Sequence, residues 1–207
     1  MLGAYSAKLN SVEINSTFYH MPTQTTIGKW ADSTPDDFRF SFKANRKITH
    51  FKKLKDATSD VDVFLNGLSP LQEKLVCVLI QLPPFFKADL DLLETFLGQK
   101  PVGSIRIAFE FRHGSWFTSQ LNALLAKYDA ALCVADTVDM KPVFERTAKF
   151  AYVRLRQDMY SKDELKNWSK RIRDFAGDSE DCFIYFKHDE TGKAANMAME
   201  FETMLKG

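Results

Sequence analysis

Short apolar runs, several with a polar residue at every second position, alternate along this chain with longer amphipathic stretches. The short runs predict strands over Val12–Asn15, Phe38–Ala44, Leu75–Gln81, Ile105–Phe111, Ala131–Asp136, Phe150–Leu155 and Cys182–Phe186. The amphipathic stretches predict helices over Thr25–Asp32, Asp60–Gly67, Leu90–Leu97, Ser119–Lys127, Lys162–Phe175 and Lys193–Leu205. Alternating strands and helices indicate parallel strands with right-handed crossovers, either in a doubly wound sheet or in a (β/α) barrel. Seven predicted strands in 207 residues favour the barrel.

The alternation inside the strands predicts which side chains face the barrel interior. In Ile105–Arg112 the apolar residues occupy one face, and the other face carries Arg106, Ala108, Glu110 and Arg112. In Phe38–Lys43 three phenylalanines oppose Arg39, Ser41 and Lys43. Because successive side chains of a strand point to opposite faces, the apolar set meets the helices and the polar set faces inward. The pattern therefore predicts a polar barrel centre.

Composition narrows the class of protein. A chain of 207 residues with 45% hydrophobic residues, 9 Gly and 7 Pro is typical of a folded protein, and we expect one domain over residues 1–207. Lys+Arg number 28 and Asp+Glu 27, so the net charge of +1 indicates no particular partner. We found neither a run long enough to cross a membrane nor a secretion signal, so we expect a cytoplasmic protein. The cysteines Cys77, Cys133 and Cys182 lie in apolar runs and are predicted to be buried free thiols.

Polar residues near the ends of the predicted strands are the candidates for a site. Active sites of (β/α) barrels lie at the carboxyl ends of the strands and use residues from several of them. The acid/base candidates are Glu110, Glu13 and Asp136, and the substrate-binding candidates include Lys43, Arg112, Arg154, Asn15 and Gln81. The alternative is an ion-pair network that only fills the barrel, although desolvating so many charges is costly. We therefore favour a small polar or anionic ligand.

Two further features lie in the predicted loops at the same end. Trp116, Phe18, Tyr19, Phe85 and Phe86 follow strands and are predicted to form an aromatic wall over the pocket. The stretch Lys43–Lys55 contains six cations and no acid. It would suit a phosphate group or, with Phe51 as a stacking face, a nucleic-acid backbone, and the alternative is a solvated loop.

The sequence offers no pattern for a metal or a cofactor. The four histidines fall in four different predicted loops without the spacing of a zinc motif, so we expect no catalytic metal. Neither a glycine-rich phosphate loop nor a G-x-S-x-G motif is present. We therefore expect chemistry without a cofactor.

The chain resembles the DUF72, or YecE-like, family. The matching stretches are Ser11-Val-Glu-Ile-Asn-Ser-Thr-Phe-Tyr19, Pro35 to Lys43, Lys47-Ile-Thr-His50, Gln81-Leu-Pro-Pro84, Glu110-Phe-Arg-His113 with Ser115-Trp116, Tyr152-Val-Arg-Leu155, and Phe186 through Asp189 and Gly192 to Ala198. The resemblance implies a TIM-type barrel, and no activity is established for the family as a group. It adds Asp189 to the binding candidates, and His188 joins them because Lys187-His188 replaces a frequent Asn-Asn pair. Arg156-Gln157 likewise replaces a frequent His-Gly pair, and both changes make the pocket rim more basic.

The resemblance also implies that a strand is missing. Members of the family begin with a strand of the type Ile-Gly-Thr-Ser-Gly-Trp, whereas this sequence starts with Met1-Leu-Gly-Ala-Tyr5, inside the helix that follows that strand. Seven strands of eight then remain, and the strands at Val12–Asn15 and Cys182–Phe186 become edges. Because open edges recruit other chains, we expect the gap to be bridged within the chain or covered in a homodimer.

Three hypotheses about function follow. The first is a cofactor-independent enzyme of the hydrolase, lyase or isomerase type, in which Glu110 and Glu13 act as acid or base while Lys43, Arg112 and Arg154 bind an anionic substrate. The second, less favoured, is a barrel that binds or processes nucleic acid through the basic stretch. The third is a ligand-binding protein without catalysis. The sequence alone leaves open whether the protein is an enzyme.

Overall fold

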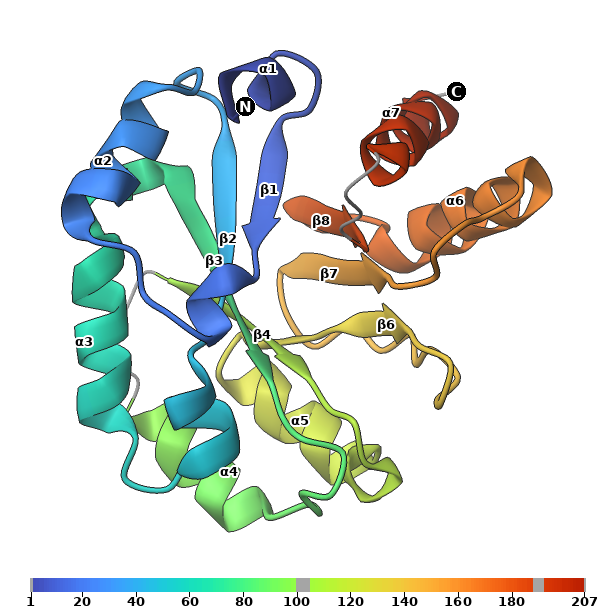
Figure 1. The fold of residues 1–207 in the computed structure, drawn as a ribbon. Coiled ribbons are helices and arrows are strands. Elements are labelled where there is room, and N and C mark those ends of the chain that lie inside the picture. Colours follow the sequence, from blue (N-terminus) through green and yellow to red (C-terminus); the bar gives the residue numbers. More distant parts are fainter. Residues whose placement is uncertain (1, 100–104, 188–191, 207) are drawn as a thin grey trace.

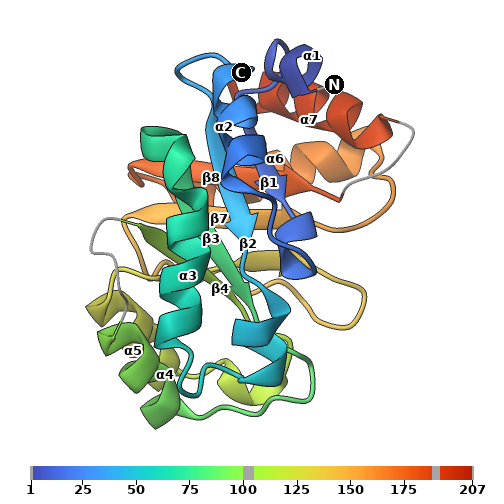
Figure 2. The same ribbon diagram turned by 60° about the vertical axis from the view of Figure 1, so that its left-hand side comes forward.

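Parallel strands in sequential order occupy the centre of the molecule, and helices cover their outer side (Figures 1 and 2). This computed structural model describes residues 2–99, 105–187 and 192–206. The strands are β1 (Ser11–Ile14), β2 (Arg39–Lys43), β3 (Leu75–Gln81), β4 (Arg106–Glu110), β5 (Ala131–Leu132), β6 (Val134–Asp136), β7 (Phe150–Leu155) and β8 (Asp181–Phe186). The longer helices are α2 (Gln24–Asp32), α3 (Thr58–Leu68), α4 (Leu90–Gly98), α5 (Ser119–Lys127), α6 (Lys162–Ala176) and α7 (Lys193–Lys206). The short helical segments are α1 (Leu2–Ser6), η1 (Ser16–Phe18), η2 (Lys47–Phe51), η3 (Ser69–Lys74) and η4 (Gly114–Trp116).

The strands pair in the order β1-β2-β3-β4-β5 and, separately, β6-β7-β8, and every pair is parallel. The predicted strand Ala131–Asp136 is divided into β5 and β6 at Cys133, whose N–H donates to the carbonyl of Phe109 at 2.8 Å. The seven predicted strands are thus all present, and the predicted α/β fold is confirmed. The predicted ends of the strands and helices differ from the observed ends by at most two residues.

Local signals explain several helix ends. The Ser161 hydroxyl accepts from the Glu164 N–H at 3.3 Å while the Glu164 carboxylate accepts from the Ser161 N–H at 2.7 Å, which is the capping box expected from the sequence. Thr23, Asp89 and Thr118 cap α2, α4 and α5 in the simpler way.

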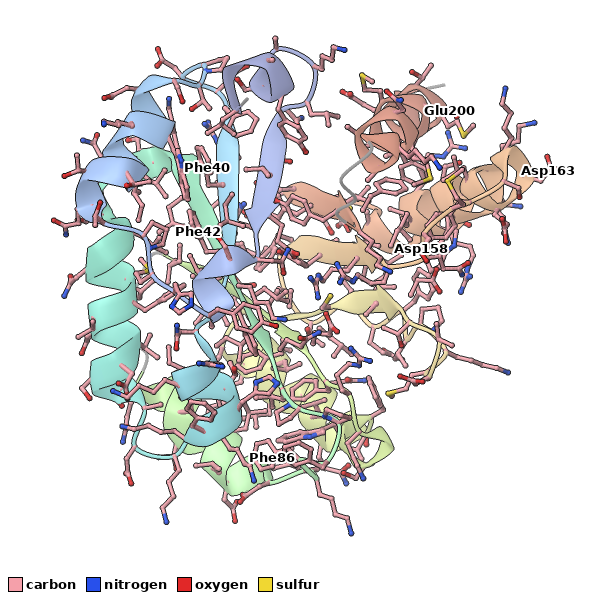
Figure 3. All side chains as sticks on the ribbon, in the orientation of Figure 1. Phe40, Phe42, Phe86, Asp158, Asp163 and Glu200 are labelled. Atoms are coloured by element: carbon pink, nitrogen blue, oxygen red, sulfur yellow. The ribbon has the colours of Figure 1, made fainter. Side chains whose placement is uncertain are left out.

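The outward strand faces form the main cores beneath the helices. Phe40 and Phe42 on β2 point toward α2 and α3 in Figure 3 and are fully buried in one cluster with Ile27 and Phe64. A second cluster joins β6 and β7 to α6 and α7. Burial of each large apolar side chain contributes about 1.5–3 kcal/mol. Among the described residues, no helix has the length and apolar character needed to cross a membrane.

The interval between β1 and β8 is bridged by side chains. In the described part of the chain, β1 pairs only with β2, and β8 pairs only with β7. The Tyr185 hydroxyl of β8 lies 2.9 Å from the Ser41 hydroxyl of β2, and Tyr152 of β7 donates to Glu13 of β1 at 2.7 Å. Side chains of β7 and β8 thus reach β1 and β2, while β1 and β8 do not pair with each other among the described residues, and the homodimer through this edge stays a prediction.

Candidate functional site

The inward strand faces build three layers from one end of the barrel to the other. At the amino ends of the strands, Arg106 pairs with Asp181 at 2.5 Å and lies over the rings of Phe150 and Phe183. The middle layer is mostly apolar and consists of Ser41, Cys77, Leu79, Ala108, Ala131, Cys133, Tyr152, Phe183 and Tyr185. The third layer, at the carboxyl ends, is called the charged layer and contains Glu13, Asn15, Lys43, Gln81, Glu110 and Arg154. This arrangement confirms that the polar strand faces point inward.

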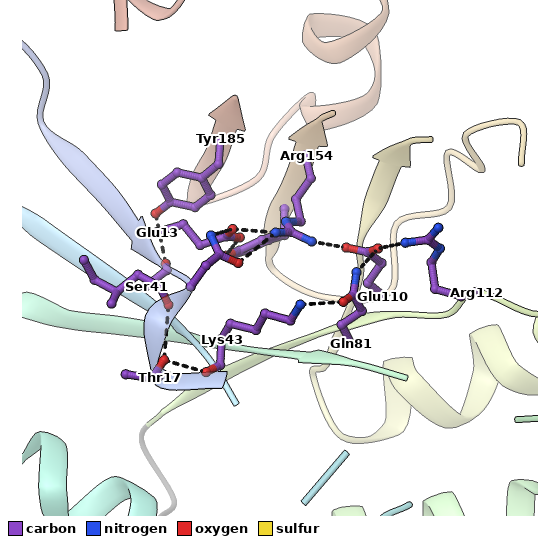
Figure 4. A network of polar contacts seen from close by, with 12 residues as sticks. Glu13, Thr17, Ser41, Lys43, Gln81, Glu110, Arg112, Arg154 and Tyr185 are labelled. Atoms are coloured by element: carbon purple, nitrogen blue, oxygen red, sulfur yellow. Dashed lines mark hydrogen bonds and ion pairs between the residues drawn. The ribbon is translucent and has the colours of Figure 1, made fainter. Parts of the chain in front are cut away.

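Arg154 of β7 is the centre of the charged layer (Figure 4). Its Nη2 donates to Glu13 Oε1 at 2.7 Å and to Asn15 Oδ1 at 3.1 Å, while its Nη1 donates to Glu110 Oε2. The side chains of Arg154, Glu110 and Glu13 are 1%, 1% and 3% exposed. Asn15 and Tyr152 also donate to Glu13, at 2.8 and 2.7 Å. One guanidinium therefore fixes two buried carboxylates from opposite sides of the barrel.

A second chain of contacts leads from Glu110 to Lys43 and Arg112 (Figure 4). These two residues, with Phe18, mark the open carboxyl end of the barrel, which is called the barrel mouth. Gln81 donates to Glu110 Oε1 at 2.5 Å and accepts from Lys43 Nζ at 2.6 Å. Arg112 Nη1 lies 3.5 Å from the same Glu110 oxygen and its Nη2 lies 3.4 Å from the exposed Asp139. Strand pairing explains the convergence, because Gln81 and Glu110 are register partners on β3 and β4.

Burial and charge shift the pKa values of three groups in this layer. Burial alone would raise the pKa of Glu110, but the charge and hydrogen bond of Arg154, together with Gln81 and Arg112, hold it below its usual value. Burial and the positive charge of Arg154 lower the pKa of Lys43 to about 8, against the opposing effects of Glu110 and Glu13. Burial and Arg154 also lower the pKa of Arg156. Glu110 is thus kept ionised, and Lys43 is made easier to deprotonate.

Six of the predicted site residues come together in this layer: Glu13, Asn15, Lys43, Gln81, Glu110 and Arg154. Arg112 lies at its rim, a quarter exposed. Arg154 was expected to bind substrate, and the structure instead engages its Nη1 and Nη2 with Glu110, Glu13 and Asn15. His188 and Asp189 lie outside the described residues.

Asp136, an acid/base candidate from the sequence, does not join the charged layer. Asp136 shares a strand face with Val134, which packs in the cluster beneath α6 and α7. Its carboxylate accepts hydrogen bonds from the Tyr160 hydroxyl at 2.5 Å and from Gln157 at 2.9 Å. A carboxylate on the helix side of the strand has a local structural partner there and does not join Glu13 and Glu110.

Trp116 also lies away from the barrel mouth, contrary to the predicted aromatic wall. Its ring stacks on Phe111 with centroids 4.5 Å apart, and its indole N–H donates to the carbonyl of Phe86 at 2.8 Å. The residue is fully buried in the outer core. Phe18 does reach the mouth, where Lys43 Nζ lies 4.3 Å from its ring centroid.

The sequence candidates omit Tyr152, and the sequence places Arg156 only at the basic pocket rim. Both have the same parity as Arg154 along β7 and just beyond it, so strict two-residue alternation places them on the inward face. Tyr152 donates to Glu13, and Arg156 is half-buried beside Arg154. Within the described residues, no carboxylate forms an ion pair with Arg156 or Lys43.

The basic stretch Lys43–Lys55 is more ordered than a solvated loop. It forms the short helix η2, and Lys47 and Lys52 both pair with Asp60 of α3 at 2.7 Å. Arg46 remains exposed beside the rings of Tyr19 and Phe51, at 5.7 and 5.3 Å from their centroids. Part of the positive charge that the sequence displays is therefore neutralised locally.

The charged layer, and not the size of a hollow, identifies the candidate site. A hollow of about 600 Å³ lies at the opposite end of the barrel and is lined by residues that include Arg146, Lys149, Asp178 and Glu180. That end of a (β/α) barrel generally serves stability, whereas the carboxyl ends carry reactive groups. In the described ranges, no three His, Cys, Asp or Glu side chains are grouped in a way that could hold a metal ion.

Fold and site together define a TIM-type (β/α) barrel with buried charges at the carboxyl ends of its strands. The sequence profile described as "Protein of unknown function DUF72" matches residues 1–207, and the chain belongs to this family. The UPF0759 protein YecE of Escherichia coli K12 is 35% identical over 117 residues, which are 56% of this chain and 43% of YecE. The match therefore spans less than half the length of that relative.

Solved structures agree with this family assignment. A DUF72 family protein from Thermotoga maritima is 27% identical, with a TM-score of 0.83 over 96% of this chain and 85% of that one. A protein from Parabacteroides distasonis described as a sugar phosphate isomerase/epimerase has a TM-score of 0.55 at 11% identity, over 97% of this chain and 86% of that one. The second likeness concerns the fold alone.

Proposed function

We propose that this barrel is an acid/base enzyme for a small polar molecule that carries negative charge. The observation that carries the proposal is an excess of positive charge at the barrel mouth. Glu13 and Glu110 are both engaged by Arg154, and Arg112 lies beside Glu110 and Asp139. Lys43 and Arg156 are then two cations without a carboxylate partner among the described residues. An anionic ligand would compensate these charges.

The alternative is that the charges only fill the barrel. A filling network would be expected to pair each buried cation, because an uncompensated buried charge is strongly destabilising. Lys43 and Arg156 are half-buried and form no ion pair with a carboxylate among the described residues. A bound anion would offset the free-energy cost of burying these two charges.

Glu110 supplies the acid/base chemistry of the proposal. It is ionised, rigidly held, and connected through Gln81 to the cation at Lys43. A carboxylate fixed in this way can accept a proton from a hydroxyl or a carbon acid whose negative charge is held by the cations beside it. Glu13 is held by three donors and would position Arg154.

Thermal denaturation in phosphate or sulfate tests the binding part of this proposal. At constant ionic strength, either anion should raise the melting temperature relative to chloride. The Arg156→Gln variant should lose this stabilisation, while Lys52→Gln, which removes a cation of the basic stretch, should retain it. The proposal fails if Lys52→Gln abolishes the effect and Arg156→Gln leaves it intact.

Turnover separates an enzyme from a binding protein. Phosphorylated and carboxylated sugars and oxo acids can be followed by NMR with the wild-type protein and with Glu110→Gln. Loss of the acid/base group should lower the rate by about 10²–10⁴-fold. An anion that binds at the mouth without conversion of any compound in the panel would instead support a ligand-binding protein.

A second candidate function is binding of single-stranded nucleic acid at the outer rim. Tyr19, Phe51 and Phe85 are 57%, 69% and 67% exposed, and Arg46 and Lys53 lie over their rings. Exposed rings beside cations suit stacked bases and phosphates. A rim complex should weaken steeply with salt, with a slope of about −0.7 per phosphate contact, whereas a small anion inside the mouth should depend on salt weakly.

A further inference from the structure

Lys43 differs from the other lysines near the mouth in its surroundings. Its Nζ hydrogen-bonds to the neutral amide oxygen of Gln81 at 2.6 Å and lies 4.3 Å from the centre of the Phe18 ring. By contrast, Lys47 and Lys52 are each paired with a carboxylate. No ion pair with a carboxylate holds Lys43 in its charged form within the described residues.

The charged groups around Lys43 lie on several different strands and on η2. The charged groups that shift the pKa of Lys43 are Arg154 of β7, Glu110 of β4, Glu13 of β1 and Arg156 after β7. His50 of η2 is also close, because burial and the charge of Lys43 lower the pKa of His50. Burial and the cations outweigh the carboxylates, so the pKa of Lys43 falls to about 8. At pH 7 about a tenth of the amine is then neutral, against about one part in three thousand for an ordinary lysine.

We propose that Lys43 is a nucleophile that forms a Schiff base with an aldehyde or ketone bearing a carboxylate or phosphate group. The unpaired, half-buried amine at the end of β2 supplies the lone pair, and Arg112 and Arg156 would hold the anionic group of the substrate. This second part rests on the proposed function. Lysines desolvated near other cations are suited to this chemistry.

The covalent step balances without a cofactor. The lone pair of the neutral amine forms a bond to the carbonyl carbon, and the π electrons of the carbonyl move to its oxygen. The nitrogen then passes one proton to that oxygen, giving a carbinolamine. With one more proton from solvent the hydroxyl leaves as water, and the nitrogen lone pair forms the C=N bond of a protonated imine. The imine nitrogen can then accept electrons from a neighbouring carbon–carbon or carbon–hydrogen bond.

Reductive trapping tests the proposal. The wild-type protein is incubated with sodium cyanoborohydride and with glycolaldehyde, glyoxylate or glycolaldehyde phosphate, and the modified lysine is located by peptide mass mapping. At pH 7, Lys43 should be labelled at least about tenfold faster than exposed lysines such as Lys55. The rate should rise with pH to half its maximum near the pKa of about 8.

Two matched variants complete the test. Lys43→Arg keeps the charge and should lose the fast label, whereas Lys53→Arg should retain it. Circular dichroism verifies that both variants fold, and mapping of the wild-type protein does not depend on either. Labelling spread evenly over exposed lysines, or an unchanged fast phase in Lys43→Arg, would overturn the nucleophile.

The three aldehydes separate this inference from the proposed function. An anion site at the mouth should make a charged aldehyde label Lys43 faster than neutral glycolaldehyde does, and the faster of glyoxylate and glycolaldehyde phosphate shows whether the site prefers a carboxylate or a phosphate. Equal labelling of Lys43 by all three aldehydes would support Lys43 as a nucleophile and contradict the proposed anion site. Stabilisation of the protein by phosphate without selective labelling of Lys43 would support the anion site and contradict the role of Lys43 as a nucleophile.

Discussion

Arg154 and Glu13 form a buried ion pair of 2.7 Å between β7 and β1, two strands that share no backbone hydrogen bonds. The same guanidinium reaches Glu110 on β4. Side chains therefore connect parts of the barrel that the strand ladder leaves separate. The charged layer organises the site and also bridges the open side of the barrel.

Replacing Arg154 with methionine should destabilise the fold by about 3–5 kcal/mol, because Glu13 and Glu110 would be left buried and uncompensated. Urea denaturation measures the change. The triple variant Arg154→Met with Glu13→Gln and Glu110→Gln should recover part of this loss. A single variant that loses less than about 1 kcal/mol would show that the pair contributes little.

Stability should fall in acid through Glu110. Its folded pKa is held below the ordinary value of 4.5, so near and below that value the unfolded chain binds more protons than the folded one. The stabilisation is present above pH 4.5 and is lost as the pH falls through the folded pKa. Urea midpoints measured from about pH 6 to about pH 3 should show this loss. The Glu110→Gln variant should have a shallower profile, and equal slopes would contradict the assignment.

Lys43 predicts a further rise of stability with pH in alkali. Its pKa is about 8 in the folded protein and 10.5 ordinarily, so between these values the unfolded chain binds the extra proton. Raising the pH through this window should relieve the cost of burying the charge and stabilise the wild-type protein relative to Lys43→Met. The difference between their free energies of unfolding isolates Lys43 from other groups that titrate there. A constant difference would show that Lys43 has an ordinary pKa.

Asp136 should matter for stability and not for ligand binding. Asp136→Asn weakens its contacts with Tyr160 and Gln157 and should cost about 1–2 kcal/mol. The stabilisation by phosphate should remain equal to that of the wild-type protein. Loss of this stabilisation in Asp136→Asn, with a melting curve that is otherwise cooperative, would restore Asp136 to the site.

The two-residue period of the strands was sufficient to predict the inward faces. It placed Glu13, Lys43, Glu110 and Arg154 in one layer, because the side-chain period of a strand is fixed by its backbone. Applied strictly, it also excludes Asp136, which shares parity with the outward Leu132 and Val134, and it includes Tyr152 and Arg156. Asp136 was included among the candidates, and Tyr152 and Arg156 were left out, because residues were selected by their position at a strand end and not by their parity.

Other features depend on contacts that no local pattern encodes. Trp116 of η4 packs into the outer core on Phe111, and Asp60 of α3 neutralises two lysines that precede it in sequence. The bridge from Tyr185 to Ser41 joins residues 144 positions apart. Such long-range contacts require the packed fold.

The most direct test of the central claim is the position of an anion in crystals of this protein grown or soaked in phosphate. We predict difference density at the barrel mouth, within hydrogen-bond distance of Lys43 Nζ and of Arg112 or Arg156. Density confined to the outer rim at Arg46 and Lys53, with the mouth empty, would contradict it.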